Sequence, residues 1–148
     1  MKLINLKENE EYLKEYIELC SKEWGSPKTK LQMKEYINKK MKDILTNDKV
    51  ISVIGLIDNK LIGFISLFKT DGDERTDLTP WYATMYIKKE YRNKGYSKIL
   101  NNAIIEEAKR LGYKKIYLKT NLTNYYEKFG AKFIEKLTKE NLYYIDLK

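Results

Sequence analysis

Histidine is absent from this chain of 148 residues, and cysteine occurs once, at Cys20. Without histidine, the Ser-His-Asp and Cys-His arrangements of covalent catalysis are excluded. A zinc site built from histidine and cysteine is excluded as well, and we expect no metal. Chemistry in this protein must use carboxylates, tyrosines, lysines, hydroxyl groups or backbone dipoles. A single cysteine cannot form an internal disulfide, which predicts a protein of the reducing cytoplasm.

Long apolar segments are also missing. The longest apolar run, Val50 to Ile57, is far shorter than the roughly 20 residues that span a bilayer. The first residues contain no apolar block of the kind that a secretory signal requires, so we expect no membrane association. Only 2 Pro and 7 Gly argue against a disordered or repetitive chain. The length suits a single domain over residues 1–148.

Positive charge exceeds negative charge by 8, with 29 basic and 21 acidic side chains. A basic surface can attract nucleic acid. However, 26 of the basic residues are lysines, spread along the whole chain, and only 3 are arginines, the commonest specific readers of guanine. The pattern favours a solvated, lysine-rich surface over a nucleic-acid interface. Its positive field would favour an anionic ligand.

Hydrophobic periodicity and turn signals predict alternating strands and helices in the first half of the chain. The expected elements are a strand over 2–6, a helix from Asn9 to Gly25, a second helix to about Thr46, and strands over Val50–Ile57, Leu61–Phe68 and Trp81–Ile87. The second helix begins either at Ser26-Pro27 or at a capping box of Thr29 and Gln32. Cys20 falls on the apolar face of the first helix, which favours a core residue over a reactive thiol.

The second half of the chain predicts a helix, a strand and a closing hairpin. The expected elements are a helix over Ser97–Leu111, a strand over Lys115–Lys119, a short helix over Asn124–Phe129 capped by Thr123, and strands over Ala131–Leu137 and Leu142–Leu147. Alternation along the strand Trp81–Ile87 would place Trp81, Ala83, Met85 and Ile87 on one face of the sheet.

The segment Tyr91-Arg92-Asn93-Lys94-Gly95-Tyr96-Ser97 joins that strand to the following helix. A strand that turns directly into a helix leaves the first N–H groups of the helix unpaired, and the helix dipole adds positive charge there. Such a site binds phosphate through the backbone, and Gly95 lets a ligand come close. With one glycine, the segment fits neither G-x-x-x-x-G-K-S/T nor G-x-G-x-x-G. Alternatively, Gly95 could simply permit a tight turn and Arg92 could be a surface cation.

Two motifs resemble those of one enzyme family. Arg92, Gly95 and Ser97 match the R/Q-x-x-G-x-G/A loop of the GNAT superfamily of N-acetyltransferases, with serine at the last small position. The segment from Asn121 to Ala131 is similar to the family's N…YEKxGF motif, with Ala131 in place of the usual aromatic. The expected order of elements also resembles the family's fold along the whole chain. The resemblance implies an α/β (α+β) fold with a mixed, mostly antiparallel sheet, flanking helices and a V-shaped splay between the central strands.

The resemblance also implies an activity: direct transfer of an acetyl group from acetyl-CoA to a primary amine. Tyr126 corresponds to the family's general acid, since a phenol stays protonated at neutral pH and can donate to the departing thiolate. Tyr126 could also be a core residue with a hydrogen-bonded hydroxyl. The cofactor contacts that the resemblance implies are Arg92, Asn93, Lys94, Gly95, Tyr96 and Ser97 for the pyrophosphate, Met85, Tyr86 and Ile87 for the pantetheine arm, and Asn121 and Asn124.

The acceptor does not follow from family resemblance. A small-molecule amine and a peptide are both expected classes, with Asp77 and Trp81 as candidate contacts and Trp24, between the first two helices, as an alternative. Asp77 could instead cap a turn. The general base stays open among Glu23, Asp77 and Glu90.

Two functions of other kinds also stay open. One is a protein- or ribosome-associated acetyltransferase, and the other is a non-catalytic acyl-CoA-binding module. Retention of Tyr126 favours catalysis. A homodimer is compatible with the resemblance.

Overall fold

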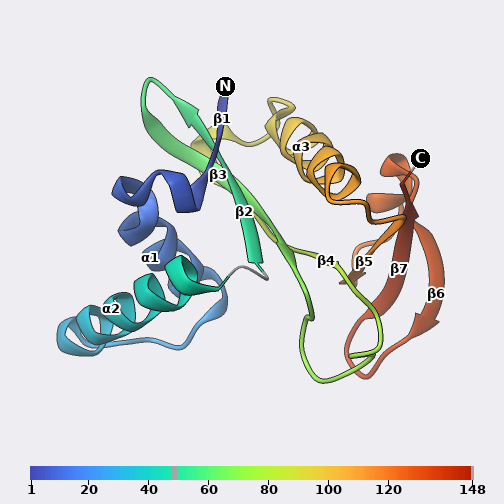
Figure 1. Ribbon diagram of the computed structural model, residues 1–148, viewed down its shortest axis with the longest axis horizontal. Coiled ribbons are helices and arrows are strands. Elements are labelled where there is room, and N and C mark those ends of the chain that lie inside the picture. Colours follow the sequence, from blue (N-terminus) through green and yellow to red (C-terminus); the bar gives the residue numbers. More distant parts are fainter. Residues whose placement is uncertain (48–49, 148) are drawn as a thin grey trace.

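One mixed sheet organises the molecule, in the computed structural model that describes residues 1–47 and 50–147 (Figure 1). Its seven strands lie in the order β1-β2-β3-β4-β5-β7-β6. Neighbouring strands are antiparallel except β4 and β5, which are parallel. The predicted mixed, mostly antiparallel sheet is therefore confirmed. The strands are β1 (Lys2–Asn5), β2 (Val50–Ile57), β3 (Lys60–Phe68), β4 (Trp81–Ile87), β5 (Lys115–Thr120), β6 (Lys132–Lys136) and β7 (Asn141–Asp146).

The helices follow the predicted order along the described residues. They are α1 (Leu13–Trp24), α2 (Lys30–Thr46) and α3 (Tyr96–Arg110), with short 3₁₀ turns η1 (Leu6–Glu8), η2 (Glu10–Tyr12), η3 (Lys89–Tyr91) and η4 (Tyr126–Phe129). Of the two predicted starts for α2, the capping box is correct. The Thr29 hydroxyl accepts from Gln32 N at 3.2 Å, and the Gln32 side chain accepts from Thr29 N at 2.9 Å.

Two predicted helix caps are wrong. The Asn9 side chain donates to the Asn5 carbonyl at 2.9 Å, and two 3₁₀ turns precede α1. Thr123 does not cap a helix either, because Asn124 lies in the left-handed region with φ 58 and cannot begin one. The Glu127 carboxylate accepts from Asn124 N at 2.8 Å instead.

Helices lie on opposite faces of the sheet, α1 and α2 on one and α3 on the other (Figure 1), and an apolar cluster lies beneath each set. Helices α1 and α2 cover one face of the β1–β4 half, where Leu13, Ile54 and Phe64 are fully buried. Helix α3 covers the other face, and its Leu100 and Ile104 pack in one cluster with residues of β3, β4, β5 and β7. Helix α3 therefore joins the two halves of the sheet through its side chains.

Strand β4 is paired very differently along its two edges. It pairs with β3 from Trp81 to Ile87, whereas it pairs with β5 only between Trp81 and Tyr117. Beyond that pair the two parallel strands separate. The predicted V-shaped splay is confirmed, and it lies between β4 and β5.

A bulge in β4 changes which side chains share a face. Phe64 pairs with Tyr86 but Ser66 pairs with Ala83, so β4 contains one extra residue. Thr84 at the bulge has φ 54, a conformation that is rare for a β-branched residue. The predicted alternation is therefore wrong beyond Ala83. Met85 and Ile87 join Tyr82 in the α3 cluster, and Tyr86 stacks on Phe64 with 5.4 Å between ring centres.

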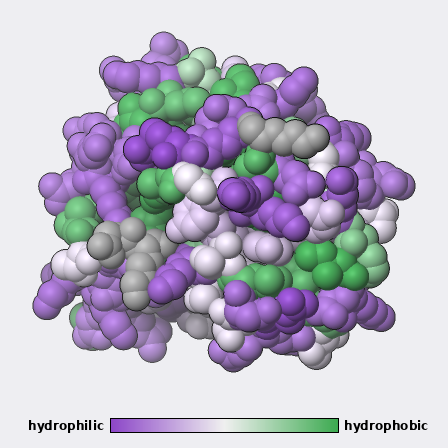
Figure 2. Space-filling model, turned by 45° about the vertical axis from the view of Figure 1, so that its right-hand side comes forward, coloured by the Kyte–Doolittle hydropathy of each residue, from purple (hydrophilic) through white to green (hydrophobic). Residues whose placement is uncertain are grey.

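The surface agrees with the predicted solvated character. Figure 2 shows a face on which hydrophilic residues predominate and hydrophobic residues form separate patches. Across residues 1–47 and 50–147, no helix combines the length and the apolar character needed to cross a membrane.

Candidate active site

The glycine-containing loop lies at the N-terminus of α3. Gly95 is the N-cap residue, with φ 85 and no side-chain oxygen to cap the helix. The first N–H groups of α3 therefore have no side-chain partner at the cap. A Cβ placed on Gly95 would meet no atom within 4 Å. The backbone here is open to a ligand, at the end of a helix that favours an anion.

Side chains hold this loop against the end of β4. The Arg92 Nε donates to the Ile87 carbonyl at 2.7 Å, and its guanidinium lies 5.6 Å from the centre of the Tyr86 ring. The Tyr125 hydroxyl donates to Ser97 Oγ at 3.4 Å. The structure thus brings the predicted loop residues together with the end of β4 and with the segment before η4.

Tyr126 lines a cavity of about 460 Å³ in the splay between β4 and β5. Its ring contacts Tyr82 edge-on, with 5.5 Å between ring centres. Burial raises the pKa of the Tyr126 phenol above its usual value, so the hydroxyl keeps its proton at neutral pH. We call this space the splay cavity, and its lining comprises Trp24, Asp71, Tyr82, Ala83, Thr84, Met85, Leu118, Lys119, Tyr126 and Glu140.

Buried polar atoms without partners gather near Tyr126. Among the described residues, the Tyr82 hydroxyl, Thr84 Oγ1 and Asn101 Nδ2 are buried and make no hydrogen bond. Tyr82 and Thr84 both line the splay cavity. The side chains of Tyr126 and Asn101 lie near the Tyr82 hydroxyl, but neither forms a hydrogen bond with it. Burial raises the pKa of Tyr82. Buried polar groups in proteins normally have partners, so these atoms indicate a site where a ligand or water supplies them.

A second, larger cavity of about 760 Å³ lies among α1, α2 and the ends of β2 and β3. Trp24 and Thr84 line both cavities, so the two meet there. We call the larger one the helix cavity. Trp24 is 52% exposed, which is unusual for so large an apolar side chain and leaves its ring available to a ligand.

Hydroxyl groups form part of the wall of the helix cavity. The Tyr16 hydroxyl lies 3.2 Å from Ser66 Oγ, which lies 2.8 Å from Ser52 Oγ. Burial raises the pKa of Tyr16 to about 12 and that of the Cys20 thiol to about 11. Both groups stay protonated at neutral pH, as expected for a Cys20 that is not a reactive thiol.

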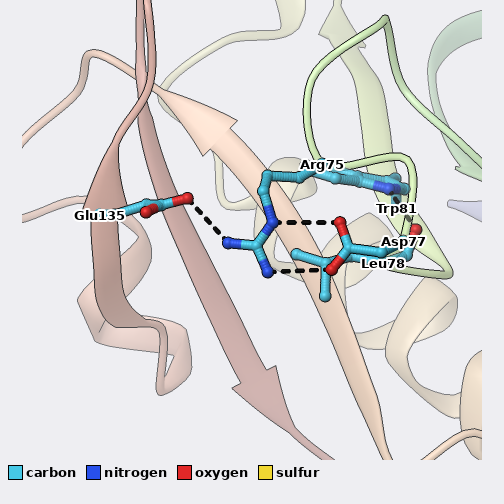
Figure 3. Close-up of polar contacts among 5 residues, drawn as sticks. All are labelled: Arg75, Asp77, Leu78, Trp81 and Glu135. Atoms are coloured by element: carbon cyan, nitrogen blue, oxygen red, sulfur yellow. Dashed lines mark hydrogen bonds and ion pairs between the residues drawn. The ribbon is translucent and has the colours of Figure 1, made fainter.

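Asp77 and Trp81 lie outside both cavities. The Asp77 carboxylate accepts from Arg75 Nε and Nη2, each at 3.1 Å, and Arg75 Nη1 donates to Glu135 at 2.7 Å (Figure 3). Hydrogen bonds from Arg75 lower the pKa of Asp77. Trp81 is fully buried and donates from Nε1 to the Leu78 carbonyl at 2.9 Å. Both residues already have partners within the chain, and of the predicted acceptor residues it is Trp24 that lines the cavities.

Other predicted residues are also placed outside the cavity linings. Asn121 and Asn124 are exposed on the segment between β5 and η4. Glu23 and Glu90, considered as general bases, are exposed as well. Neither pair lines the splay cavity or the helix cavity.

Sequence reasoning missed two carboxylates that do line the splay cavity, Asp71 and Glu140. Lys119 Nζ donates to the Asp71 carbonyl at 2.8 Å and lies 3.9 Å from Asp71 Oδ1. Burial raises the pKa of Asp71. The negative charge of Glu140 contributes to the raised pKa of Tyr126, so this carboxylate acts near the phenol. Asp71 could have been suspected from its place just after β3, whereas no sequence signal marks Glu140.

No metal site stands out in the part of the chain that the structure describes. Within it, no three or more Cys, Asp and Glu side chains gather as metal ligands would. The expectation of a protein without metal stays a prediction.

Comparisons with known proteins add independent findings. Residues 11–131 match the model of the Acetyltransferase (GNAT) family. N-alpha-acetyltransferase 30 of Schizosaccharomyces pombe is 26% identical over 125 residues, covering 81% of this chain and 77% of that protein.

Solved structures share the fold over the whole chain. PaiA N-acetyltransferase from Thermoplasma acidophilum in complex with coenzyme A has a TM-score of 0.68 at 19% identity, with 99% of each chain covered. An aminoglycoside 6'-N-acetyltransferase complexed with coenzyme A has a TM-score of 0.72 at 16% identity, covering 100% of this chain and 98% of that one. At these identities the likeness shows the fold.

Proposed function

The chain belongs to the GNAT family of acetyltransferases, and we propose that it transfers an acetyl group from acetyl-CoA to the primary amine of an acceptor bound in the two joined cavities. The observation that carries this proposal is the splay cavity. It combines Tyr126, a protonated phenol, with the open edge of β4, and it meets a larger cavity in which an acceptor can lie.

The chain's own groups suit acetyl-CoA. The N–H groups at the start of α3, over 93–98, would hold the pyrophosphate beside Gly95. Among the residues that the structure describes, no strand pairs with the β5 side of β4 over Met85–Ile87, and this edge would hydrogen-bond the pantetheine arm. The net charge of +8 attracts an anionic cofactor. When bound, acetyl-CoA supplies the activated acetyl thioester.

Protein groups would then donate protons to, or stabilise charges on, the reacting atoms. Tyr126 would protonate the departing sulfur, because its raised pKa keeps a proton available. The backbone N–H near Met85 would polarise the thioester carbonyl. Asp71 and Glu140 would attract the acceptor's ammonium group, which must lose a proton before attack. Asp71, with its raised pKa, is a better candidate for a base than the exposed Glu23 or Glu90.

A peptide acceptor is a second candidate, and one finding favours it. The relative from S. pombe is named as an N-alpha-acetyltransferase, and a cavity of about 760 Å³ lies in the range that holds small molecules or a few residues. A ribosome-associated form of this activity would bind RNA with a steep salt dependence. Membership of an enzyme family speaks against a non-catalytic role. A cytoplasmic location, the absence of a metal and a homodimer stay part of this proposal.

An acceptor panel tests the proposal. Purified protein is mixed with acetyl-CoA and with simple amines, aminoglycosides, amino acids or peptides, and release of free CoA is followed. We expect release that depends on both the amine and Tyr126. Binding of acetyl-CoA without acceptor-dependent release across the panel would contradict the proposal.

A further inference from the structure

We propose that the acceptor is a primary amine joined through an apolar body to a negatively charged group, as in a short acidic peptide, and that polycations are poor acceptors. This inference rests on the proposed function, because it specifies what the same site accepts. It follows from how charge is distributed between the splay cavity and the helix cavity.

The splay cavity is the negative end. Its charged lining residues are Asp71, Glu140 and Lys119, two carboxylates against one ammonium group. Lys119 and Asp71 form an ion pair, with 3.9 Å between Nζ and Oδ1, so Glu140 contributes the excess negative charge. Glu140 acts on the Tyr126 phenol through its negative charge. An ammonium group is therefore drawn toward Tyr126, where the chemistry would occur.

Much of the wall of the helix cavity is apolar. Trp24 stands where the two cavities meet, and apolar and aromatic side chains from both helices and both strands continue from it. This part of the wall can contact an apolar body of moderate size. The side chains concerned are Ile17, Trp24, Tyr36, Ile44, Val50 and Phe68.

The charged lining of the helix cavity is positive on balance. Its charged lining residues are Lys40, Lys69 and Asp43, two ammonium groups against one carboxylate. Lys40 and Cys20 both line this cavity, and the Lys40 charge partly offsets the rise that burial causes in the pKa of the Cys20 thiol. The Lys40 ammonium also lies 5.7 Å from the centre of the Tyr36 ring.

A further lysine adds positive charge beside the helix cavity, with its Nζ 3.3 Å from where a Cβ on Gly25 would lie. Lys28 Nζ lies 4.3 Å from the centre of the Tyr36 ring and donates to Ser21 Oγ and the Ser26 carbonyl, each at 3.0 Å. Tyr36, which lines the cavity, is thus flanked by two ammonium groups. A second positive charge on the acceptor would meet these lysines, whereas a carboxylate would be attracted by them.

The test uses three peptides that differ in one charge: Met-Leu-Glu, Met-Leu-Gln and Met-Leu-Lys, each amidated at the C-terminus, with spermidine as a polycation. We expect kcat/KM to fall in the order Glu, Gln, Lys, with about tenfold between the first and the last, as for partly screened charges. Spermidine should be the poorest acceptor.

Substitutions in α2 test whether Lys40 causes the preference for the Glu peptide. Lys40→Glu should bring the Glu-to-Lys preference to about one or below. Lys39→Glu is the matched control, because Lys39 is exposed on the same helix and lines neither cavity. Its preference should match that of the unaltered protein. If Lys40→Glu does not fold, Lys40→Gln replaces it in the test. This variant should reduce the logarithm of the Glu-to-Lys ratio of kcat/KM by about half.

The outcomes separate the two proposals. Preference for the Lys peptide or for spermidine, or a charge preference that Lys40→Glu and Lys40→Gln leave unchanged, overturns the inference while the acetyltransferase activity stands. No acetylation of any peptide or amine, with acetyl-CoA still bound, overturns the proposed function and the inference with it.

Discussion

The two edges of β4 show how one strand can serve two purposes. On the β3 side the pairing extends from Trp81 to Ile87, and side chains such as Phe64 and Ile65 are fully buried. On the β5 side one residue pair is formed, and beyond it lie a cavity, two carboxylates and buried polar atoms without partners. The paired edge contributes stability through burial. The open edge leaves backbone and side-chain groups free for a ligand.

Side chains bridge the region that the open edge leaves unpaired. The loop between β3 and β4 reaches β5 through Lys119 and Asp71, and it reaches β6 through Arg75 and Glu135. The Glu74 carboxylate accepts from Thr138 N at 3.3 Å. These contacts are partly or wholly exposed, and such pairs contribute little stability. The C-terminal half of the sheet also shares one apolar cluster with α3, β3 and β4.

Removing the phenol at the open edge has the largest expected effect. Tyr126→Phe should lower kcat on the order of 10²-fold, because the proton donor is lost. The Kd for acetyl-CoA should stay nearly unchanged, because the ring still packs on Tyr82. Tyr143→Phe is the matched control, since Tyr143 belongs to the same apolar cluster but lines neither cavity. Equal turnover of Tyr126→Phe and Tyr143→Phe would end this assignment.

The pH profile of the unaltered enzyme belongs to the same prediction. Burial raises the pKa of Tyr126, so the phenol should remain protonated up to its ordinary value of about 10 and beyond. Turnover should therefore rise with pH as the amine loses its proton, and fall only above that region. A descending limb near neutral pH would contradict the role of Tyr126.

Changing the loop next to the open edge has the second largest effect. Gly95→Val should raise the Kd for acetyl-CoA about tenfold, because the added side chain would cost one or two charge-assisted hydrogen bonds to the pyrophosphate. Gly112→Val is the matched control, because both glycines have φ near +85 (85 and 87) and an added Cβ meets no atom within 4 Å at either. Both variants should lose similar stability, but Gly112→Val should keep its affinity. Gly95→Asn, which tolerates the left-handed conformation, should weaken binding less than Gly95→Val. Equal affinities in calorimetry for the two valine variants would place the pyrophosphate elsewhere.

The exposed ion pair of Asp77 has the smallest expected effect. Asp77→Asn should change the acceptor KM by less than about twofold, because Asp77 pairs with Arg75 and lines neither cavity. Asp71→Asn, at a carboxylate that lines the splay cavity, should raise the acceptor KM more than the acetyl-CoA KM. If steady-state kinetics show a larger change in acceptor KM for Asp77→Asn than for Asp71→Asn, the acceptor binds at the loop around Asp77.

Local patterns allowed most of the fold to be predicted. The β-branched, apolar run Val50–Ile57 matched the bounds of β2, and the capping box of Thr29 and Gln32 marked the start of α2. The loop before α3 was recognisable because phosphate binding at a helix N-terminus needs only a turn and a glycine. The family resemblance then predicted the splay.

Features that depend on pairing between distant residues were not predicted. The bulge at Thr84 arises from the register of β4 against β3, so it reversed the expected faces of Met85 and Ile87. Asp71 and Glu140 meet in one cavity although 69 positions separate them (140 − 71). Asp77 carried the right chemistry for an acceptor contact, but Arg75, two residues away, already binds it.

Hydrogen exchange of backbone amides, compared with and without CoA, tests whether the unpaired edge of β4 binds the ligand. We expect slower exchange in the presence of CoA over Tyr82–Ile87, at the open edge of β4, and over 93–98, in the loop before α3 and its first residues. Exchange in β2 and in the closing strands β6 and β7 should stay unchanged. Protection confined to α1, α2 or β2, with none over Tyr82–Ile87 and 93–98, would contradict the claim that the unpaired edge of β4 is the functional one.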